Sequence, residues 1–185
     1  MDALSKNNMT PAPSHHKQKA KAVVQDNPSH VSEEAAALGR QHFLSGFYCA
    51  ESVLKAMADI HGIKDPNIPK IATGFCGGIA RTSGMCGALA GGIMALGLLC
   101  GRSTPTDPKE QCYTLTYHLV NLFRERFGST QCTKLLDCDI STAEGARKYV
   151  ESDLNTSVCT PITSQATALA EEIYARRDSL RHPLL

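Results

Sequence analysis

The stretch GFCGGIARTSGMCGALAGGIMALGLLCG, residues 74–101, decides how this chain folds. It holds nine of the fourteen glycines and three of the eight cysteines. Its second half is apolar and crowded with small residues, which predicts a buried helix over residues 85–99. Each glycine in a helix costs about 1 kcal/mol relative to alanine. A chain tolerates that cost where another backbone or a cofactor must approach closely, so the stretch predicts a glycine turn followed by a tightly packed helix.

Helical patterns flank this stretch on both sides. We expect helices over residues 32–45, 48–61, 68–74, 107–127 and 141–152, a short one from residue 129, and a last one from the turn at 159–161 to about 177. Ser32 and Asp107 are the expected N-caps, and STAE at 141–144 is a capping box. No alternating strand or hairpin pattern is present. The predicted fold class is therefore all-α, a compact single-domain bundle of about six or seven helices.

Composition limits the domain organisation and the classes of function. The 185 residues suffice for one domain with its own core, which we place at residues 31–185. Residues 1–30 are polar, lack an apolar leader, and are expected to form a flexible tail. A net charge of +1 and the absence of Trp argue against a nucleic-acid partner. The longest apolar run is short and rich in glycine, so we expect no membrane insertion and a cytoplasmic protein.

Eight cysteines without a secretion signal indicate metal binding or redox chemistry more than structural disulfides. Helix starts favour thiolates and offer N–H donors to sulfur, so cysteines expected there are the better metal-ligand candidates. Cys76 is a further candidate because it shares the glycine turn with Cys86. The cysteines expected at helix starts or turns are Cys49, Cys86, Cys132 and Cys159.

The remaining cysteines and the absent motifs narrow this hypothesis. Cys100 and Cys112 are interpreted as small buried hydrophobic residues within helices, while the role of Cys138 stays open. No CxxC occurs, which argues against zinc ribbons, simple ferredoxin runs and thioredoxin-type dithiols. CxxCH and GxxxxGK[ST] are also absent, so the glycine turn is not a phosphate-binding Walker loop.

The chain resembles the C-GCAxxG-C-C family of redox-active proteins over about residues 33–177. The resemblance rests on GFYCAESVL at 46–54, TGFCGGI at 73–79, CGALAG at 86–91, FGSTQC at 127–132, and Cys159. It implies that the four cysteines in the family's name are Cys49, Cys86, Cys132 and Cys159. At Cys76 the resemblance leads us to expect a small residue instead.

A related domain occurs in split-Soret cytochrome c, a dimeric dihaem protein with an additional iron–sulfur centre. Because the haem attachment motif is absent here, only the iron–sulfur part of that likeness applies. The resemblance thus implies an iron–sulfur cluster-binding redox protein that transfers electrons or senses redox state, as a homodimer with a redox partner protein. A metal-free thiol–disulfide oxidoreductase and a zinc-binding structural or adaptor protein are the alternatives.

Four further residues are candidates for contact with the cofactor: Gly77, Gly78, Arg81 and Gly87. Some of the glycines between residues 77 and 84 are expected to adopt positive φ and to direct backbone N–H groups toward sulfur. Arg81 is expected to pair with an anionic cluster or with a carboxylate. The small-residue helix over 87–97 suits a closely packed helix partner, which favours a homodimer; the alternative is that all this packing is internal to one subunit.

Overall fold

The computed structural model describes residues 28–184, which form helices and one isolated β-bridge. The all-α prediction is confirmed, with a helix count slightly above the expected six or seven. In chain order the described elements are α1 (Pro28–Leu44), α2 (Cys49–Ile60), the 3-10 helix η1 (Lys70–Phe75), α3 (Cys76–Arg81), α4 (Gly87–Cys100), α5 (Glu110–Phe127), α6 (Cys132–Leu136), α7 (Ala143–Glu151), the π-helix η2 (Asn155–Cys159) and α8 (Thr160–Ala175).

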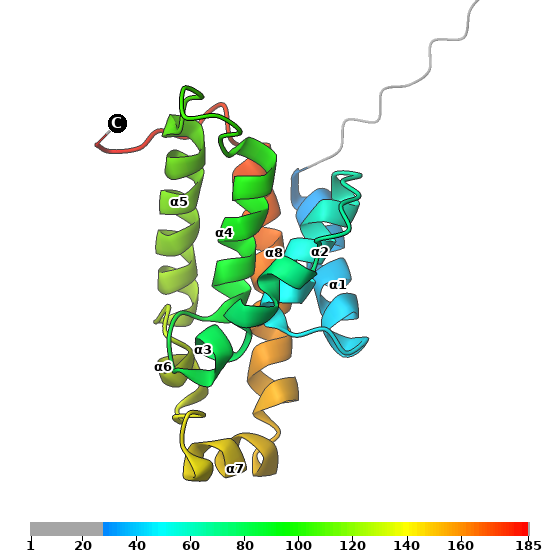
Figure 1. The fold of residues 1–185 in the computed structure, drawn as a ribbon, viewed down its shortest axis with the longest axis vertical. Coiled ribbons are helices and arrows are strands. Elements are labelled where there is room, and N and C mark those ends of the chain that lie inside the picture. Colours follow the sequence, from blue (N-terminus) through cyan, green and yellow to red (C-terminus); the bar gives the residue numbers. More distant parts are fainter. Residues whose placement is uncertain (1–27, 185) are drawn as a thin grey trace, which may run out of the picture.

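Helix α8 is the centre of the bundle. It packs against α1, α2, α4 and α5, and Figure 1 shows it running behind α4, between α5 and the α1–α2 pair. The short elements α6 and α7 gather at the lower end of the view. The fold thus has a regular helical part and an irregular end. Within residues 28–184, no helix is long and apolar enough to cross a membrane.

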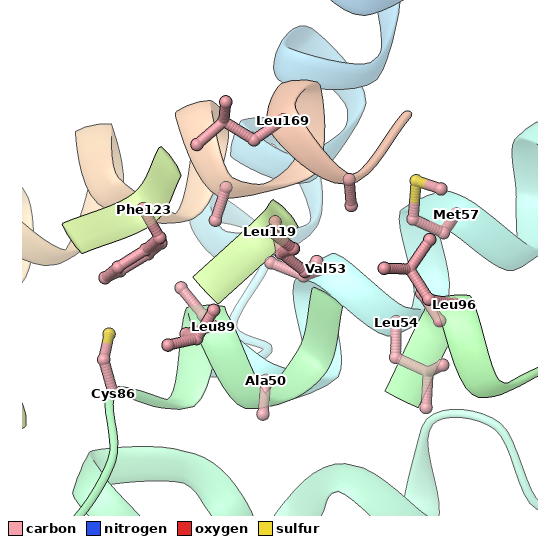
Figure 2. Close-up of a cluster of buried hydrophobic side chains, with 14 of the residues drawn as sticks. Ala50, Val53, Leu54, Met57, Cys86, Leu89, Leu96, Leu119, Phe123 and Leu169 are labelled. Carbon is pink, nitrogen blue, oxygen red and sulfur yellow. The ribbon is translucent and has the colours of Figure 1, made fainter. Parts of the chain in front are cut away.

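Apolar side chains from α2, α4, α5 and α8 form the core (Figure 2). Leu54, Leu119, Phe123 and Leu169 are almost completely removed from water. Burying a side chain of this kind contributes about 1.5–3 kcal/mol. Cys86, the N-cap of α4, belongs to the same cluster, so the core extends to the N-terminal end of α4.

The glycines of α4 serve packing within the chain. A Cβ on Gly91 would lie 2.5 Å from the backbone oxygen of Ala50 in α2, and one on Gly92 would lie 3.0 Å from Leu119 Cδ2 in α5. Both positions therefore let neighbouring helices come close. Since these contacts are internal, the small-residue helix gives no separate reason for a homodimer, which stays a prediction.

The start of α1 differs from the prediction. The helix begins at Pro28, so Ser32 lies inside it and is not the N-cap. Proline is well tolerated in the first turn of a helix, because the N–H it lacks has no partner there. Residues 28–30 of the predicted tail are consequently helical, and residues 1–27 of that tail lie outside the described residues.

Two other predicted helix starts are shifted. Asp107 does not cap α5: its carboxylate accepts hydrogen bonds from the N–H groups of Ser103 and Thr104, each at 2.8 Å, and so closes the preceding turn. Helix α5 begins at Glu110 instead. In the capping box before α7, the cap is Thr142, whose hydroxyl accepts a hydrogen bond from a backbone N–H one turn on.

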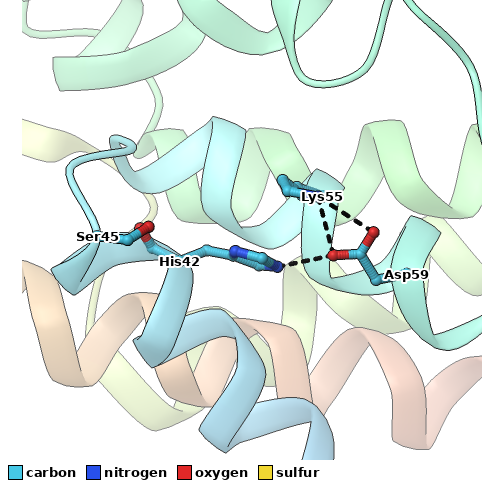
Figure 3. A network of polar contacts seen from close by, with 4 residues as sticks. All are labelled: His42, Ser45, Lys55 and Asp59. Carbon is cyan, nitrogen blue, oxygen red and sulfur yellow. Dashed lines mark hydrogen bonds and ion pairs between the residues drawn. The ribbon is translucent and has the colours of Figure 1, made fainter.

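A polar network links α1 to α2 (Figure 3). His42 Nε2 lies 2.8 Å from Asp59 Oδ2, and Lys55 Nζ lies 3.0 Å from the same oxygen. Partly exposed ion pairs contribute about 0–1 kcal/mol each. The network therefore helps to orient the two helices, while apolar packing supplies most of the stability.

Candidate metal centre

The glycine turn is a left-handed stretch of backbone. Gly77, Gly78, Ile79 and Ala80 have φ of 63°, 67°, 60° and 50°, and Arg81 continues with 65°. The prediction that some glycines of this turn adopt positive φ is confirmed at Gly77 and Gly78. Each left-handed residue that carries a Cβ costs about 1–2 kcal/mol, so the turn holds strain beyond its two glycines. Such strain persists where the surroundings fix the backbone, and it concentrates at functional sites.

An isolated antiparallel β-bridge holds two distant cysteines side by side. The N–H of Cys86 donates to the carbonyl oxygen of Thr130 at 2.8 Å, and the N–H of Cys132 donates to that of Gly84 at 2.9 Å. Cys86 is the N-cap of α4, and Cys132 is the first residue of α6. The bridge therefore sets the ends of both helices against one another.

Gly78 is the point where the left-handed turn passes Cys132. A Cβ on Gly78 would lie 2.5 Å from Cys132 Cβ and 3.2 Å from its Sγ. The carbonyl oxygen of Gly78 also accepts a hydrogen bond from the Gly84 N–H, at 2.9 Å. Both the positive φ and the lack of space explain why glycine is required here.

Cys49 opens α2, and its sulfur lies against the start of α4. The Glu51 carboxylate accepts hydrogen bonds from the Tyr48 N–H at 2.8 Å and from the Thr73 hydroxyl at 2.6 Å, which ties the start of α2 to η1. A Cβ on Gly87 would collide with Cys49 Sγ. Glycine at this position therefore gives the thiol its room.

One cavity of about 360 Å³ gathers most of the predicted site. It lies at the irregular end of the bundle, among the starts of α2, α4, α6 and α8. The remaining wall is largely apolar and includes Leu136 and Ile140. The predicted site residues that line the cavity are Cys49, Cys86, Cys132, Cys159, Gly77, Arg81 and Gly87.

Two predicted site residues lie behind the cavity wall. Cys76 is buried and is not part of the lining, and its thiol donates to the carbonyl oxygen of Ala72 at 3.7 Å. Hydrogen bonding with Cys49, and then burial, raise the pKa of Cys76 well above its usual range. Cys76 thus contacts Cys49 on the side that faces away from the cavity. Gly78 also does not line the cavity, but it packs against Cys132, which does.

Burial raises the pKa of three of the thiols that line the cavity. It raises the pKa of Cys86 to about 12, although the N–H groups of Ala88 and Leu89 at the start of α4 lower it. It also raises the pKa of Cys132 to about 11 and that of Cys159 above its usual value. At Cys86 the expected helix-start donors are present, but desolvation outweighs them. Binding to a metal ion would deprotonate such thiols outright.

Tyr149 of α7 is the site residue that sequence reasoning missed. Its hydroxyl donates to Asn155 Oδ1 at 2.8 Å and lies 3.8 Å from Cys159 Sγ. Burial raises the pKa of Tyr149, so the hydroxyl remains a hydrogen-bond donor. No motif marks this residue. The only signal was an aromatic side chain on a short polar helix just before the segment that carries Cys159.

The cysteines surround the cavity and do not converge on one point. Among residues 28–184, no three His, Cys, Asp or Glu side chains form a group that could hold a single metal ion. Two of the histidines have other partners: His61 Nε2 lies 2.8 Å from Glu171 Oε2, and His118 Nε2 lies 2.9 Å from the carbonyl oxygen of Arg181. A cofactor held by these cysteines would therefore have to span the cavity.

Fold and site define a cysteine-rich, all-α protein with four thiols around one cavity. Residues 47–173 match the family described as "putative redox-active protein (C_GCAxxG_C_C)", and the chain belongs to that family. The resemblance drawn from the sequence is thus confirmed, and the family supports a redox role in general terms. No curated protein and no solved structure matches the chain.

Proposed function

We propose that this protein binds an iron–sulfur cluster in the cavity and serves in electron transfer or redox sensing. The observation that carries the proposal is that Cys49, Cys86, Cys132 and Cys159 come from four separate segments and line one cavity. Cysteine thiolates are the usual ligands of such clusters. The absence of a side chain at Gly87 keeps space free beside Cys49.

The residues around the cavity would hold and tune the cluster. Backbone N–H groups of Ala88 and Leu89 donate toward the Cys86 sulfur, and such donors favour the more negative, reduced state. Arg81 brings a positive charge to the cavity wall, and Ile140 helps to exclude water. When bound, the cluster would supply one-electron oxidation and reduction.

The two alternatives fit the site less well. A thiol–disulfide oxidoreductase needs an accessible thiolate, whereas burial raises the pKa of Cys86 and of Cys132. A structural zinc ion needs its thiolates about 2.3 Å from one point. No such group occurs within the described part of the chain.

Metal and sulfide analysis of anaerobically purified protein tests the proposal. We expect brown protein with iron and acid-labile sulfide, whose colour bleaches on reduction. Zinc without sulfide would support the zinc alternative, and metal-free protein with linked cysteines would support the dithiol. Protein that stays free of iron and sulfide after reconstitution with ferrous iron and sulfide would overturn the cluster.

The proposal includes a redox partner protein, a homodimer and a cytoplasmic location. Tyr48 and Val150 line the cavity and are 58% and 75% exposed, so apolar surface lies where an electron-transfer partner would approach. Light scattering at micromolar concentration tests the dimer. The mass of a single 19.9 kDa chain would contradict it.

A further inference from the structure

Cys100 and Cys112 lie at the neighbouring ends of α4 and α5, two helices that pack against each other. Cys100 lies one turn beyond Leu96 on α4, and Cys112 lies one turn before Leu115 on α5. Both leucines are fully buried in the same core cluster, and α4 packs against α5. Both cysteines therefore lie at the end of the α4–α5 contact where α4 ends and α5 begins.

This pair is remote from the cavity. The connection between α4 and α5 lies at the top of Figure 1, whereas α6 and α7 lie at the bottom. Neither Cys100 nor Cys112 lines the cavity, and both lie outside the four-cysteine pattern of the family. Whatever chemistry they perform is consequently independent of the proposed cluster.

The connection that joins the two cysteines is closed by its own hydrogen bonds. The Thr104 hydroxyl donates to Asp107 Oδ1 at 2.7 Å, and Arg102 Nη1 donates to the carbonyl oxygen of Pro105 at 3.2 Å. These contacts close local turns within residues 102–107, between the end of α4 at Cys100 and the start of α5 at Glu110. A bond between the two sulfurs would therefore join helix ends that the fold has already brought together.

The two thiols also interact directly. Burial, and then the charge and hydrogen bonding of Cys112, raise the pKa of Cys100 to about 12. The Cys100 thiol donates to the carbonyl oxygen of Leu96 at 2.9 Å. Both side chains are half-buried, so each remains within reach of a small reagent. The raised pKa keeps Cys100 protonated at neutral pH, so we assign it the second step of the exchange.

We infer that Cys100 and Cys112 form a second redox site, a dithiol that a small-molecule disulfide oxidises reversibly to an intramolecular disulfide. In the first step, Cys112 sulfur attacks the incoming disulfide, forms a mixed disulfide and expels one thiol, which takes up the Cys112 proton. In the second step, Cys100 sulfur attacks Cys112 sulfur, and the second thiol leaves with the Cys100 proton. Both cysteines together lose two electrons and two protons, and the small disulfide gains them.

Thiol mapping of the full-length protein tests this site. The protein is equilibrated with glutathione buffers of increasing oxidised fraction, the free thiols are alkylated, and linked peptides are identified by mass spectrometry. We expect a peptide pair joined through Cys100 and Cys112, with the loss of two hydrogen atoms and of both alkylation sites. The iron content should not change, so the outcome is independent of the cluster.

Single substitutions separate the two steps. Cys100→Ser should trap glutathione on Cys112, because the resolving thiol is gone, and the intramolecular link should disappear. Cys138→Ser is the matched control and should leave the Cys100–Cys112 link at its wild-type yield. The inference is overturned if wild-type protein yields no such peptide at any buffer ratio, or if either cysteine links preferentially to a different cysteine.

Discussion

The core and the cavity end follow different physical rules. In the core, Leu119 and Phe123 lie fully buried on regular helices. At the cavity end, Ile79 and Ala80 adopt left-handed backbone, and buried Cys86 and Cys132 have raised pKa values. Stability favours neither left-handed residues with a Cβ nor desolvated thiols. Their combination at the cavity end supports the proposal that this end binds a cofactor.

The largest expected effect is on cofactor content. Cys86→Ser should lose most of the iron, because a thiolate ligand is replaced by a hydroxyl. Iron per chain after anaerobic purification measures this loss. Cys112→Ser is the matched control: it lies at the far end of the bundle and should keep its iron. Full iron retention in Cys86→Ser would remove Cys86 from the ligand set.

A substitution in the core should act on stability and leave the site chemistry intact. Phe123→Ala should lower the free energy of unfolding of the cluster-free protein by about 3–5 kcal/mol, because it removes a fully buried aromatic ring. Urea denaturation measures the change. Leu98→Ala, on the exposed side of α4, should change it by no more than about 0.5 kcal/mol. Similar losses in both variants would contradict the assigned core.

Gly78→Ala should change both the stability of the protein and the binding of its cofactor. The alanine must adopt a φ of 67°, and its Cβ would lie 2.5 Å from Cys132 Cβ. We expect a destabilisation of at least about 1–2 kcal/mol from the left-handed backbone alone. Because the strain bears on Cys132, cluster occupancy or midpoint potential should also change. Lower stability with unchanged occupancy and potential would show that the turn serves packing only.

Gly97→Ala, in the same stretch of sequence, should raise the stability that Gly78→Ala lowers. Gly97 lies within α4, has no positive φ, and has open space where a Cβ would be placed. The substitution should stabilise the protein by up to about 1 kcal/mol, because alanine is the better helix former. A thermal melt of both glycine variants compares them, and a destabilised Gly97→Ala would mean that this face of α4 is occupied, for instance in a dimer.

The smallest effect concerns pH and the α4–α5 connection. Hydrogen bonds from Thr104 and Ser103 lower the pKa of Asp107, so its contribution to stability is present above the unfolded-state pKa and is lost as pH falls through the lower folded-state value. Asp107→Asn should therefore show a smaller fall in Tm than wild type when the pH is lowered from 7 to 3. Identical acid dependence in both proteins would contradict this role.

Several features of the site could be predicted from local sequence. The positions of Cys49, Cys86, Cys132 and Cys159 at or next to helix starts follow from nearby turn and cap signals, which act over a few residues. The positive φ of Gly77 is local in the same way. Local sequence predicts a helix start wrongly where one side chain can make two different hydrogen bonds. Asp107 could cap α5, but its carboxylate closes the preceding turn instead.

The sequence by itself determined the all-α class, the family and the cysteines of interest, because helix periodicity and motif spacing are properties of neighbouring residues. Only the tertiary structure decided which thiols share a cavity, that Cys76 lies behind Cys49, that Tyr149 reaches Cys159, and that Cys100 meets Cys112. These relations join segments far apart along the chain. Helix packing sets these relations. By excluding water it also raises the pKa of Cys86, Cys132 and Cys159, where helix starts alone predicted a lower one.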